Sequence, residues 1–438
     1  MTSLRETVIR HARMPARRQL WTFAWLAVGS QGEAILSVLS TIALARTTTA
    51  SEAGKVFFAQ SLMSVWFLLC DPRLEDAAQR YVPLQQSRDG GGAALFGRLL
   101  RWDVGIGAGA SGVALLITLA GYQIGGVPGD LAVLLTLAII TGGAISSTGS
   151  AGAAFALTGR LKWLGRVRLR CAVVLFLLTL GGLLVGGPAG YLAGQAAGAL
   201  VTAAVLAREA MKSIHSTYGP PVPGVAMPTG LVRFSVKAST ATSAAAASES
   251  GLLALAGVVG GPTLVTILKI SLAPARIYTS LISPVASMLQ PRLAEAAAVG
   301  EGRRIRTDVT RSSLALGALG AGALVAAAPF IGPALGLAYG PSYAQTGTAA
   351  LLLLAVACAK GGVSWSKVLP LAIGKPGWRL AFLTIEGLLN LGLLLAAVWV
   401  APEPIATAVT FGWGALALTV LGSAFWVLSL RRLVVCHD

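Results

Sequence analysis

Residues 160–212 of this 438-residue chain read RLKWLGRVRLRCAVVLFLLTLGGLLVGGPAGYLAGQAAGALVTAAVLAREAMK. Arginine and lysine gather at both ends of this stretch. Between them lie two apolar runs, 170–186 and 188–207, joined by a loop of only a few residues at Gly186–Pro188. A helix needs about 20 mostly apolar residues to cross the hydrocarbon core of a bilayer. The stretch therefore predicts two membrane-spanning helices that return the chain to the side on which it started.

The same pattern continues along the whole chain, with positive charge in every second loop between apolar stretches. The basic clusters lie at 5–18, 73–101, 160–170, 208–233, 292–311, 367–379 and 431–432. Cytoplasmic loops retain lysine and arginine because moving these residues across the membrane is costly. We therefore predict a multi-pass protein of the bacterial cytoplasmic (inner) membrane with both termini in the cytoplasm. Only Arg46 and Lys55 break the alternation.

The composition excludes an ordinary soluble domain. The mean hydropathy is +0.75 and 12% of residues are charged, against about 25% in soluble proteins. The net charge of +17 would suggest nucleic acid in a soluble chain, but here it belongs to loops beside anionic lipid headgroups, so we expect no nucleic-acid partner. The four cysteines are scattered and no nucleotide-binding motif occurs. We expect no metal site, no cofactor and no direct use of ATP.

The apolar stretches predict about twelve helices in two sets of six, an all-α membrane bundle. The expected spans lie near 20–45, 54–70, 103–123, 129–156, 170–186, 188–207, 231–258, 262–289, 312–337, 346–369, 378–400 and 403–429. A basic cytoplasmic segment, 1–19, precedes an N-terminal lobe at 20–215. A proline-rich cytoplasmic linker, 216–228, separates this lobe from a C-terminal lobe at 229–438.

The two sets of helices resemble each other. The segment Pro72–Ala78 (PRLEDAA) matches Pro291–Ala297 (PRLAEAA), and Leu157–Trp163 matches Leu371–Arg379 in the same order. Six spans in each half give both halves the same orientation. This predicts two parallel repeats related by an axis along the membrane normal.

The outer loops are very short, for example Val259–Gly261 and Ala401–Glu403. Membrane glycosyltransferases and polysaccharide polymerases need substantial outer loops to hold their catalytic groups. We therefore expect a transporter and not an enzyme.

Short segments carry a resemblance to a known family. They are SEAG at 51–54, RYVP at 80–83, LVRFS at 231–235, PRL at 291–293, YGPSYA at 339–344 and GKP at 374–376. With these segments the chain resembles the polysaccharide flippases of the multidrug/oligosaccharidyl-lipid/polysaccharide exporter superfamily, over nearly its whole length.

The resemblance implies a two-lobed bundle with a V-shaped central cavity that works by alternating access. The implied cargo is an undecaprenyl-diphosphate-linked oligosaccharide, moved from the inner to the outer leaflet for surface polysaccharide synthesis. The implied driving force is a proton or sodium gradient. Membrane lipids and the polymerase and assembly proteins of the polysaccharide are the implied partners.

Ionisable residues inside spans are candidates for function because a charge near the bilayer centre is costly without a partner or a wet cavity. Lys269 and Arg276 lie seven residues apart in one span, and Lys237 lies in the preceding span. Arginine and lysine bind phosphate oxygens strongly. These three cations are therefore candidates to line a cavity that binds the diphosphate.

The acids in the spans are candidates for ion coupling or for structural ion pairs. Glu33 has the same expected depth as Arg276 and is a candidate for coupling to protons or sodium. Glu249 and Lys269 have the same expected depth in the membrane. Lys360 and Glu386 likewise have the same expected depth in the membrane. Either match can be a structural pair or part of the coupling.

Other functions remain as alternatives. An ion-coupled multidrug exporter of the same superfamily would need a cavity dominated by acids and aromatic residues, and a lipid II flippase would need more spans. A scaffold for polysaccharide assembly enzymes would not need the charges inside the membrane. Sugar recognition would rest on dispersed polar side chains such as those of Gln31, Gln60, Ser64 and Gln195.

Overall fold

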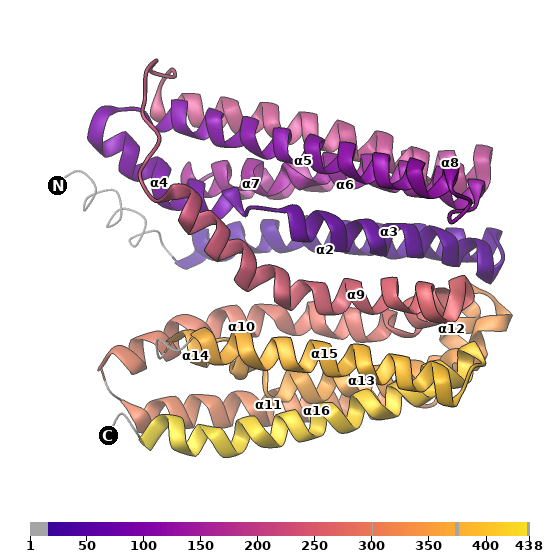
Figure 1. Ribbon diagram of the computed structural model, residues 1–438. Coiled ribbons are helices and arrows are strands. Elements are labelled where there is room, and N and C mark those ends of the chain that lie inside the picture. Colours follow the sequence, from indigo (N-terminus) through magenta and orange to yellow (C-terminus); the bar gives the residue numbers. More distant parts are fainter. Residues whose placement is uncertain (1–15, 300, 373–375, 436–438) are drawn as a thin grey trace. The chain divides into compact units, whose positions relative to one another are not determined.

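The computed structural model describes residues 16–299, 301–372 and 376–435, and every regular element among them is helical (Figure 1). The predicted all-α membrane bundle is thereby confirmed for this part of the chain. Packing contacts divide the chain into two compact units. Unit 1 holds the described residues of Met1–Thr41 and Cys70–Ser239, and unit 2 holds those of Ile42–Leu69 and Thr240–Asp438. The predicted lobes, 20–215 and 229–438, stay a prediction.

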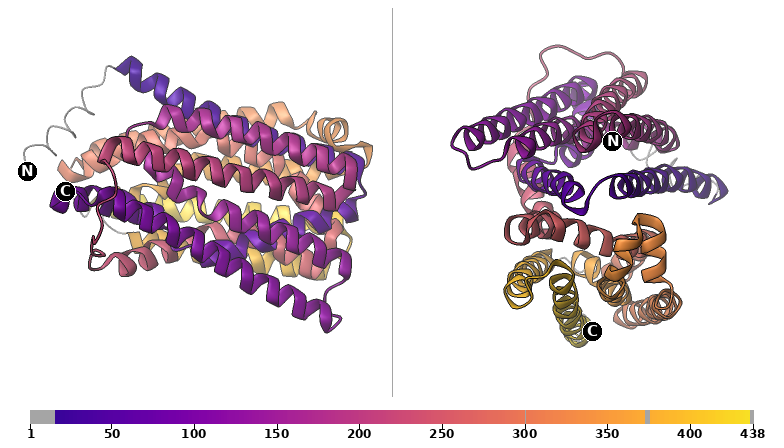
Figure 2. Two further views of the ribbon diagram at one scale, coloured as in Figure 1. Left: turned by 90° about the horizontal axis from the view of Figure 1, so that it is seen from above. Right: turned by 90° about the vertical axis from the view of Figure 1, so that its right-hand side faces the viewer.

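Unit 1 is built from the greater part of α2, from α4 to α8 and from the start of α9. These helices are α2 (Ala16–Thr47), α4 (Leu74–Asp89), α5 (Gly92–Gln123), α6 (Gly129–Ser146), α7 (Thr148–Leu157), α8 (Leu161–Tyr218) and α9 (Leu231–Ser271). Within the unit α5 packs against α6 and α6 against α8, side by side (Figure 2). The buried side chains of Leu95, Phe96 and Leu99 on α5 join Phe155 of α7 and Ile214 of α8 in one apolar cluster.

Helix α8 is a hairpin of two spans. Its 58 residues would extend about 87 Å at 1.5 Å per residue, nearly three times the thickness of the hydrocarbon core. The backbone of Gly186 and Gly187 is not helical, and Gly187 has a φ of 56° that glycine adopts without a steric penalty. The two halves approach closely, because a Cβ added to Gly182 would overlap the carbonyl oxygen of Gly190. Small residues thus let the two backbones meet.

Unit 2 contains α3 and the helices that follow the start of α9. They are α3 (Ala50–Cys70), α10 (Ala273–Val299), α11 (Gly302–Ala327), α12 (Ile331–Tyr339), η1 (Pro341–Thr346), α13 (Gly347–Gly362), η2 (Ser364–Lys367), α14 (Leu369–Ala372), α15 (Pro376–Val400) and α16 (Pro404–Val435). Helix α9 breaks at Gly261, which has a φ of 76°. Beyond the break, Thr266 donates a hydrogen bond to the carbonyl oxygen of Ala50 at 2.7 Å, and a Cβ on Gly54 would overlap the carbonyl oxygen of Pro262.

Arg46, one of the two cations that break the charge alternation, closes the end of a helix. Its Nε donates to the carbonyl oxygen of Ala338 at 2.7 Å, and its guanidinium also donates to the carbonyl oxygen of Leu337. These carbonyls lie in the last turn of α12, where no intrahelical donor remains and a cation complements the negative end of the helix dipole.

The helices confirm the positions of the apolar stretches but extend beyond them at their basic ends. Nine segments of the described chain are long and apolar enough to cross a membrane, and the segment Leu161–Tyr218, counted once, is the two-span hairpin of α8. Helix α5 begins at Gly92 where 103 was predicted, and α8 begins at Leu161 where 170 was predicted. Hydropathy marks the part of a helix that lies in hydrocarbon, whereas the helix itself continues into the polar region.

The close approach in the α8 hairpin gives a testable prediction. Gly182→Ala should lower the stability of the protein by about 1–3 kcal/mol because the added methyl group overlaps backbone across the hairpin. The adjacent Gly181→Ala is a matched control, since nothing lies within 4 Å of a Cβ added there. It should be neutral or slightly stabilising because alanine favours a helix. Thermal unfolding of the full chain in detergent checks both variants, and equal losses would contradict the packing described.

Candidate functional site

Lys269 lies near the end of α9 and is held by α3. Its Nζ donates to Oε1 of Gln60 at 2.9 Å and lies 4.1 Å from the centre of the Phe57 ring. An amide oxygen and the face of an aromatic ring both stabilise an ammonium group away from bulk water. Neither of these two partners is acidic. Gln60, expected from the sequence to contact sugar, therefore serves as a partner of this lysine.

Arg276 follows on α10, and its side chain is exposed. Only Leu272 separates α9 from α10, and the helical path continues through it. The amide of Leu272 donates to the carbonyl oxygen of Leu268 at 2.9 Å, and the amide of Arg276 donates to that of Leu272 at 3.0 Å. Arg276 follows Lys269 by seven residues along this path. Two like charges thus lie about two helical turns apart.

Two candidates from the sequence fall outside the described part of the chain. The side chains of Lys237 and Glu249 are not among those that the structure describes, although both residues lie within α9. The depth match between Glu249 and Lys269 stays a prediction.

Lys360 and Glu386 form an ion pair between α13 and α15. The distance from Nζ of Lys360 to Oε1 of Glu386 is 2.6 Å. The residues assigned to one depth from the sequence are therefore in direct contact. An ion pair between two spanning helices stabilises their packing, because a charge in hydrocarbon is costly without a partner.

Glu33 lines a cavity within unit 1. The cavity has a volume of about 290 Å³ and is bounded by α2, α6, α7 and α8, with Arg168 and Gln195 among its lining residues. Ser37, Ser40, Thr148 and Thr202 also line it. The cavity therefore combines one acid, one arginine and several neutral hydrogen-bonding groups. The sequence predicted a loop position for Arg168, because hydropathy places the start of the span at 170. In the structure Arg168 lies in the second turn of α8.

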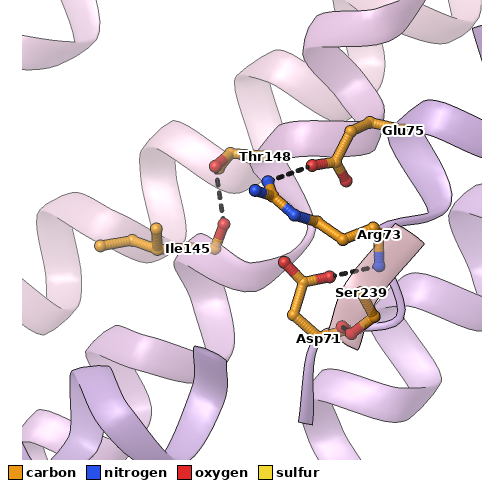
Figure 3. A network of polar contacts seen from close by, with 6 residues as sticks. All are labelled: Asp71, Arg73, Glu75, Ile145, Thr148 and Ser239. Atoms are coloured by element: carbon orange, nitrogen blue, oxygen red, sulfur yellow. Dashed lines mark hydrogen bonds and ion pairs between the residues drawn. The ribbon is translucent and has the colours of Figure 1, made fainter. Parts of the chain in front are cut away.

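A polar network closes the junction between α3 and α4 (Figure 3). The amide of Arg73 donates to Oδ1 of Asp71 at 2.8 Å, and its guanidinium donates to Oε1 of Glu75 at 2.8 Å. Ser239 donates to the carbonyl oxygen of Asp71. Arg73 has a φ of 53° at this tight bend, and the hydrogen bonds of the network hold the bend in place. Asp103 of α5, near this network in the chain order of unit 1, is 2% exposed.

The sequence analysis did not identify Asp103 as a buried acid, because residue 103 was the expected start of a span. The helix begins eleven residues earlier, at Gly92, so the carboxyl group lies inside the helix bundle. Of the other polar residues considered for sugar recognition, Ser64 lies 3.2 Å from Ser250, oxygen to oxygen. Among the described residues, no group of three or more histidine, cysteine or acidic side chains is placed to hold a metal ion.

Comparisons with known proteins identify the fold. No protein-family model and no curated protein sequence matches the chain. An inward-facing multidrug resistance MATE family transporter of the MOP superfamily aligns with a TM-score of 0.68 at 12% identity, over 92% of this chain and 95% of that one. An outward-facing MATE transporter aligns with a TM-score of 0.64 at 11% identity, over 94% of this chain and 95% of the other.

A MOP superfamily transporter from Pyrococcus furiosus, described by the reverse polarity of its binding pocket, aligns with a TM-score of 0.64 at 11% identity, over 94% of this chain and 95% of that one. At this level of identity the similarity establishes the fold alone. The chain has the fold of the MATE transporters of the MOP superfamily, and its spanning helices make it a multi-pass membrane protein.

The ion pair between α13 and α15 gives a second prediction. Lys360→Met and Glu386→Gln should each cost about 1 kcal/mol of stability because each removes the ion pair and leaves one charged group without its partner. The double variant should recover much of this loss, with a coupling energy of about 1 kcal/mol. Thermal unfolding of the four proteins checks the cycle. Strictly additive losses would contradict a direct ion pair.

Proposed function

We propose that this protein moves a polyprenyl-diphosphate-linked oligosaccharide from the inner to the outer leaflet of the bacterial cytoplasmic membrane by alternating access. The fold supports transport, because solved structures with this fold include both an inward-facing and an outward-facing transporter. The observation that carries the proposed cargo is the pair of cations, Lys269 and Arg276, on one helical path through the membrane.

The chemistry of this pair favours a phosphate cargo. Two neighbouring positive charges repel each other in a medium of low dielectric constant, and an anion bound to both removes that repulsion. The guanidinium of Arg276 can donate two parallel hydrogen bonds to phosphate oxygens, and the ammonium of Lys269 can bind a further oxygen. A diphosphate offers two adjacent phosphate groups whose oxygens can accept these hydrogen bonds. Lys237, a candidate cation from the sequence, stays a prediction because its side chain is not among those that the structure describes.

The acid in unit 1 suits a role in coupling. Glu33 shares its cavity with Arg168, Gln195 and several hydroxyl groups. A carboxylate that can exchange a cationic partner for a proton or a sodium ion links ion binding to conformation. We propose that Glu33 binds the coupling ion. We propose a structural role for the Lys360–Glu386 pair and leave Glu249 as a partner for Lys269.

Multidrug export is the second candidate, because structures with this fold are described as multidrug resistance transporters. Cationic drugs would favour acids at the binding site, whereas the two charged residues that define the proposed site, Lys269 and Arg276, are cations. The Pyrococcus furiosus transporter, for which reverse pocket polarity is taken to suggest a different function, supports the view that pocket charge follows cargo within this fold. A lipid II flippase is a related alternative, and a scaffold for assembly enzymes is a non-transport alternative.

Substitution of Arg276 tests the cargo site. In a bacterial strain that lacks its oligosaccharide-lipid flippase, the wild-type chain should restore surface polysaccharide and prevent accumulation of the lipid-linked precursor. Arg276→Ala should reduce this rescue at least tenfold at equal protein level, because a charge-assisted bond to phosphate is lost. Arg303→Ala, which removes an exposed arginine of α11, is the matched control. Full rescue by Arg276→Ala would remove this residue from the mechanism, and equal loss in the control would show an effect of charge alone.

Substitution of Glu33 tests coupling separately. In pulse-labelled cells, a protonophore or a sodium ionophore should slow the appearance of labelled polysaccharide at the surface for the wild-type chain. Glu33→Gln should be slow without either compound and insensitive to both, because a glutamine cannot exchange a proton or balance a sodium ion. Glu301→Gln, an exposed acid, should behave like the wild type. Ionophore sensitivity retained by Glu33→Gln would refute the assignment.

A further inference from the structure

Unit 2 contains a second cavity, which we call the α15–α16 cavity. It is bounded by α13, η2, α15 and α16 and has a volume of about 290 Å³. The ion pair of Lys360 and Glu386 forms one part of its lining. Lys367 of η2 and Arg379, in the first turn of α15, form another part, about 10 Å further along α15 from the ion pair.

Three donors that line this cavity lack an acceptor. Nε of Arg379, Oγ of Ser423 and Nε1 of Trp426 are buried and have no hydrogen-bond partner among the residues that the structure describes. Trp426 is 2% exposed. Buried polar groups in proteins are nearly always satisfied, so a bound ligand with acceptor oxygens would complete the hydrogen bonding of these three groups. By contrast, the neighbouring Trp365 donates its Nε1–H to Ser313 at 2.9 Å.

The charge of the lining favours an anion. Among its described residues the lining holds three cations, Lys360, Lys367 and Arg379, and one acid, Glu386, which gives a formal charge of +2. Glu386 is in contact with Lys360, at 2.6 Å, whereas Arg379 lies at the other end of the lining. Arginine together with an indole N–H is well suited to the oxygens of a phosphate group.

The rest of the cavity is apolar and reaches the surface of the helices. Ile385, Leu389 and Phe425 line it and are 58%, 48% and 48% exposed. The ring of Phe425 stacks on that of Phe382 with centroids 6.0 Å apart, and Phe382 packs edge-on against Trp426 at 5.1 Å. Exposed apolar side chains on a spanning helix contact lipid chains. The cavity thus has a cationic end and an exposed apolar side.

We propose that the α15–α16 cavity binds an anionic phospholipid, with the headgroup phosphate at Arg379, Ser423 and Trp426 and an acyl chain along Ile385, Leu389 and Phe425. The basic end of the cavity complements the phosphate of such a lipid, and the apolar groove beside it complements the hydrocarbon chain. This site lies on helices other than α9 and α10, which carry Lys269 and Arg276, so it does not depend on the proposed cargo.

The test is a titration of the purified full chain in a neutral detergent. Its thermal unfolding midpoint is followed against dihexanoylphosphatidylglycerol, dihexanoylphosphatidylcholine and inorganic phosphate, since a ligand that binds only the folded protein raises the midpoint. Phosphatidylglycerol should raise the midpoint with saturation, and the other two should have little effect. Arg379→Gln should raise the phosphatidylglycerol concentration required by about tenfold, because one charge-assisted hydrogen-bonding group is lost. Arg303→Gln, the control, should titrate as the wild type.

A second pair of variants keeps the test informative if Arg379→Gln does not fold. Trp426→Phe retains an aromatic ring in the cluster but removes the donor, so its midpoint without lipid should stay near that of the wild type while its response to phosphatidylglycerol weakens several-fold. Trp378→Phe changes an exposed indole outside the cavity and should have no effect. Equal responses to the two lipids, or unchanged titration of both cavity variants, would overturn the proposal. An equal response to inorganic phosphate would overturn the lipid assignment in favour of a free-anion site.

Discussion

The structure depends on one constraint, which is that a chain in hydrocarbon must satisfy its own backbone hydrogen bonds. Every regular element of the described chain is accordingly a helix, and the long helices α8 and α9 break only at glycines, at Gly187 and Gly261, where a positive φ reverses the chain in very few residues. Such short connections between spans leave the chemistry to side chains that project from the helices themselves. The position of each charge on a helix therefore matters more here than it would on a soluble protein.

The charges within the helices fall into two kinds. Lys360 and Glu386 compensate each other, and Arg46 compensates the terminal carbonyls of α12. These contacts are complete within the protein and hold helices together. Lys269 and Arg276 are instead like charges on one helical path, and Lys269 contacts an amide oxygen and an aromatic ring. Two cations on one helical path are the feature that an anionic cargo would explain and that helix packing alone would not require.

Much of the fold was predictable from the sequence, because span positions follow from hydropathy and the tight turns follow from short Gly/Pro loops. The ends of the helices were not, since α5 and α8 continue for about ten residues into polar sequence that hydropathy assigns to loops. This error hid Asp103 and Arg168, both of which lie within helices. The pairing of Lys360 with Glu386 followed from depth alone. The roles of Gln60 toward Lys269, and of Trp426 and Arg379 in one cavity, depend on contacts between distant segments that no local pattern reveals.

The central claim is that the protein moves a diphosphate-linked lipid. The most direct test is a flipping assay with the purified chain in liposomes that contain a fluorescent polyprenyl-diphosphate disaccharide, labelled on the sugar, in both leaflets. A membrane-impermeant quencher added outside removes only the outer-leaflet signal. Our account predicts that the protein exposes the remaining labelled lipid to the quencher, and that an unlabelled polyprenyl diphosphate competes. A signal that remains protected, in liposomes whose protein transports a cationic dye, would contradict it and assign the fold to drug export here.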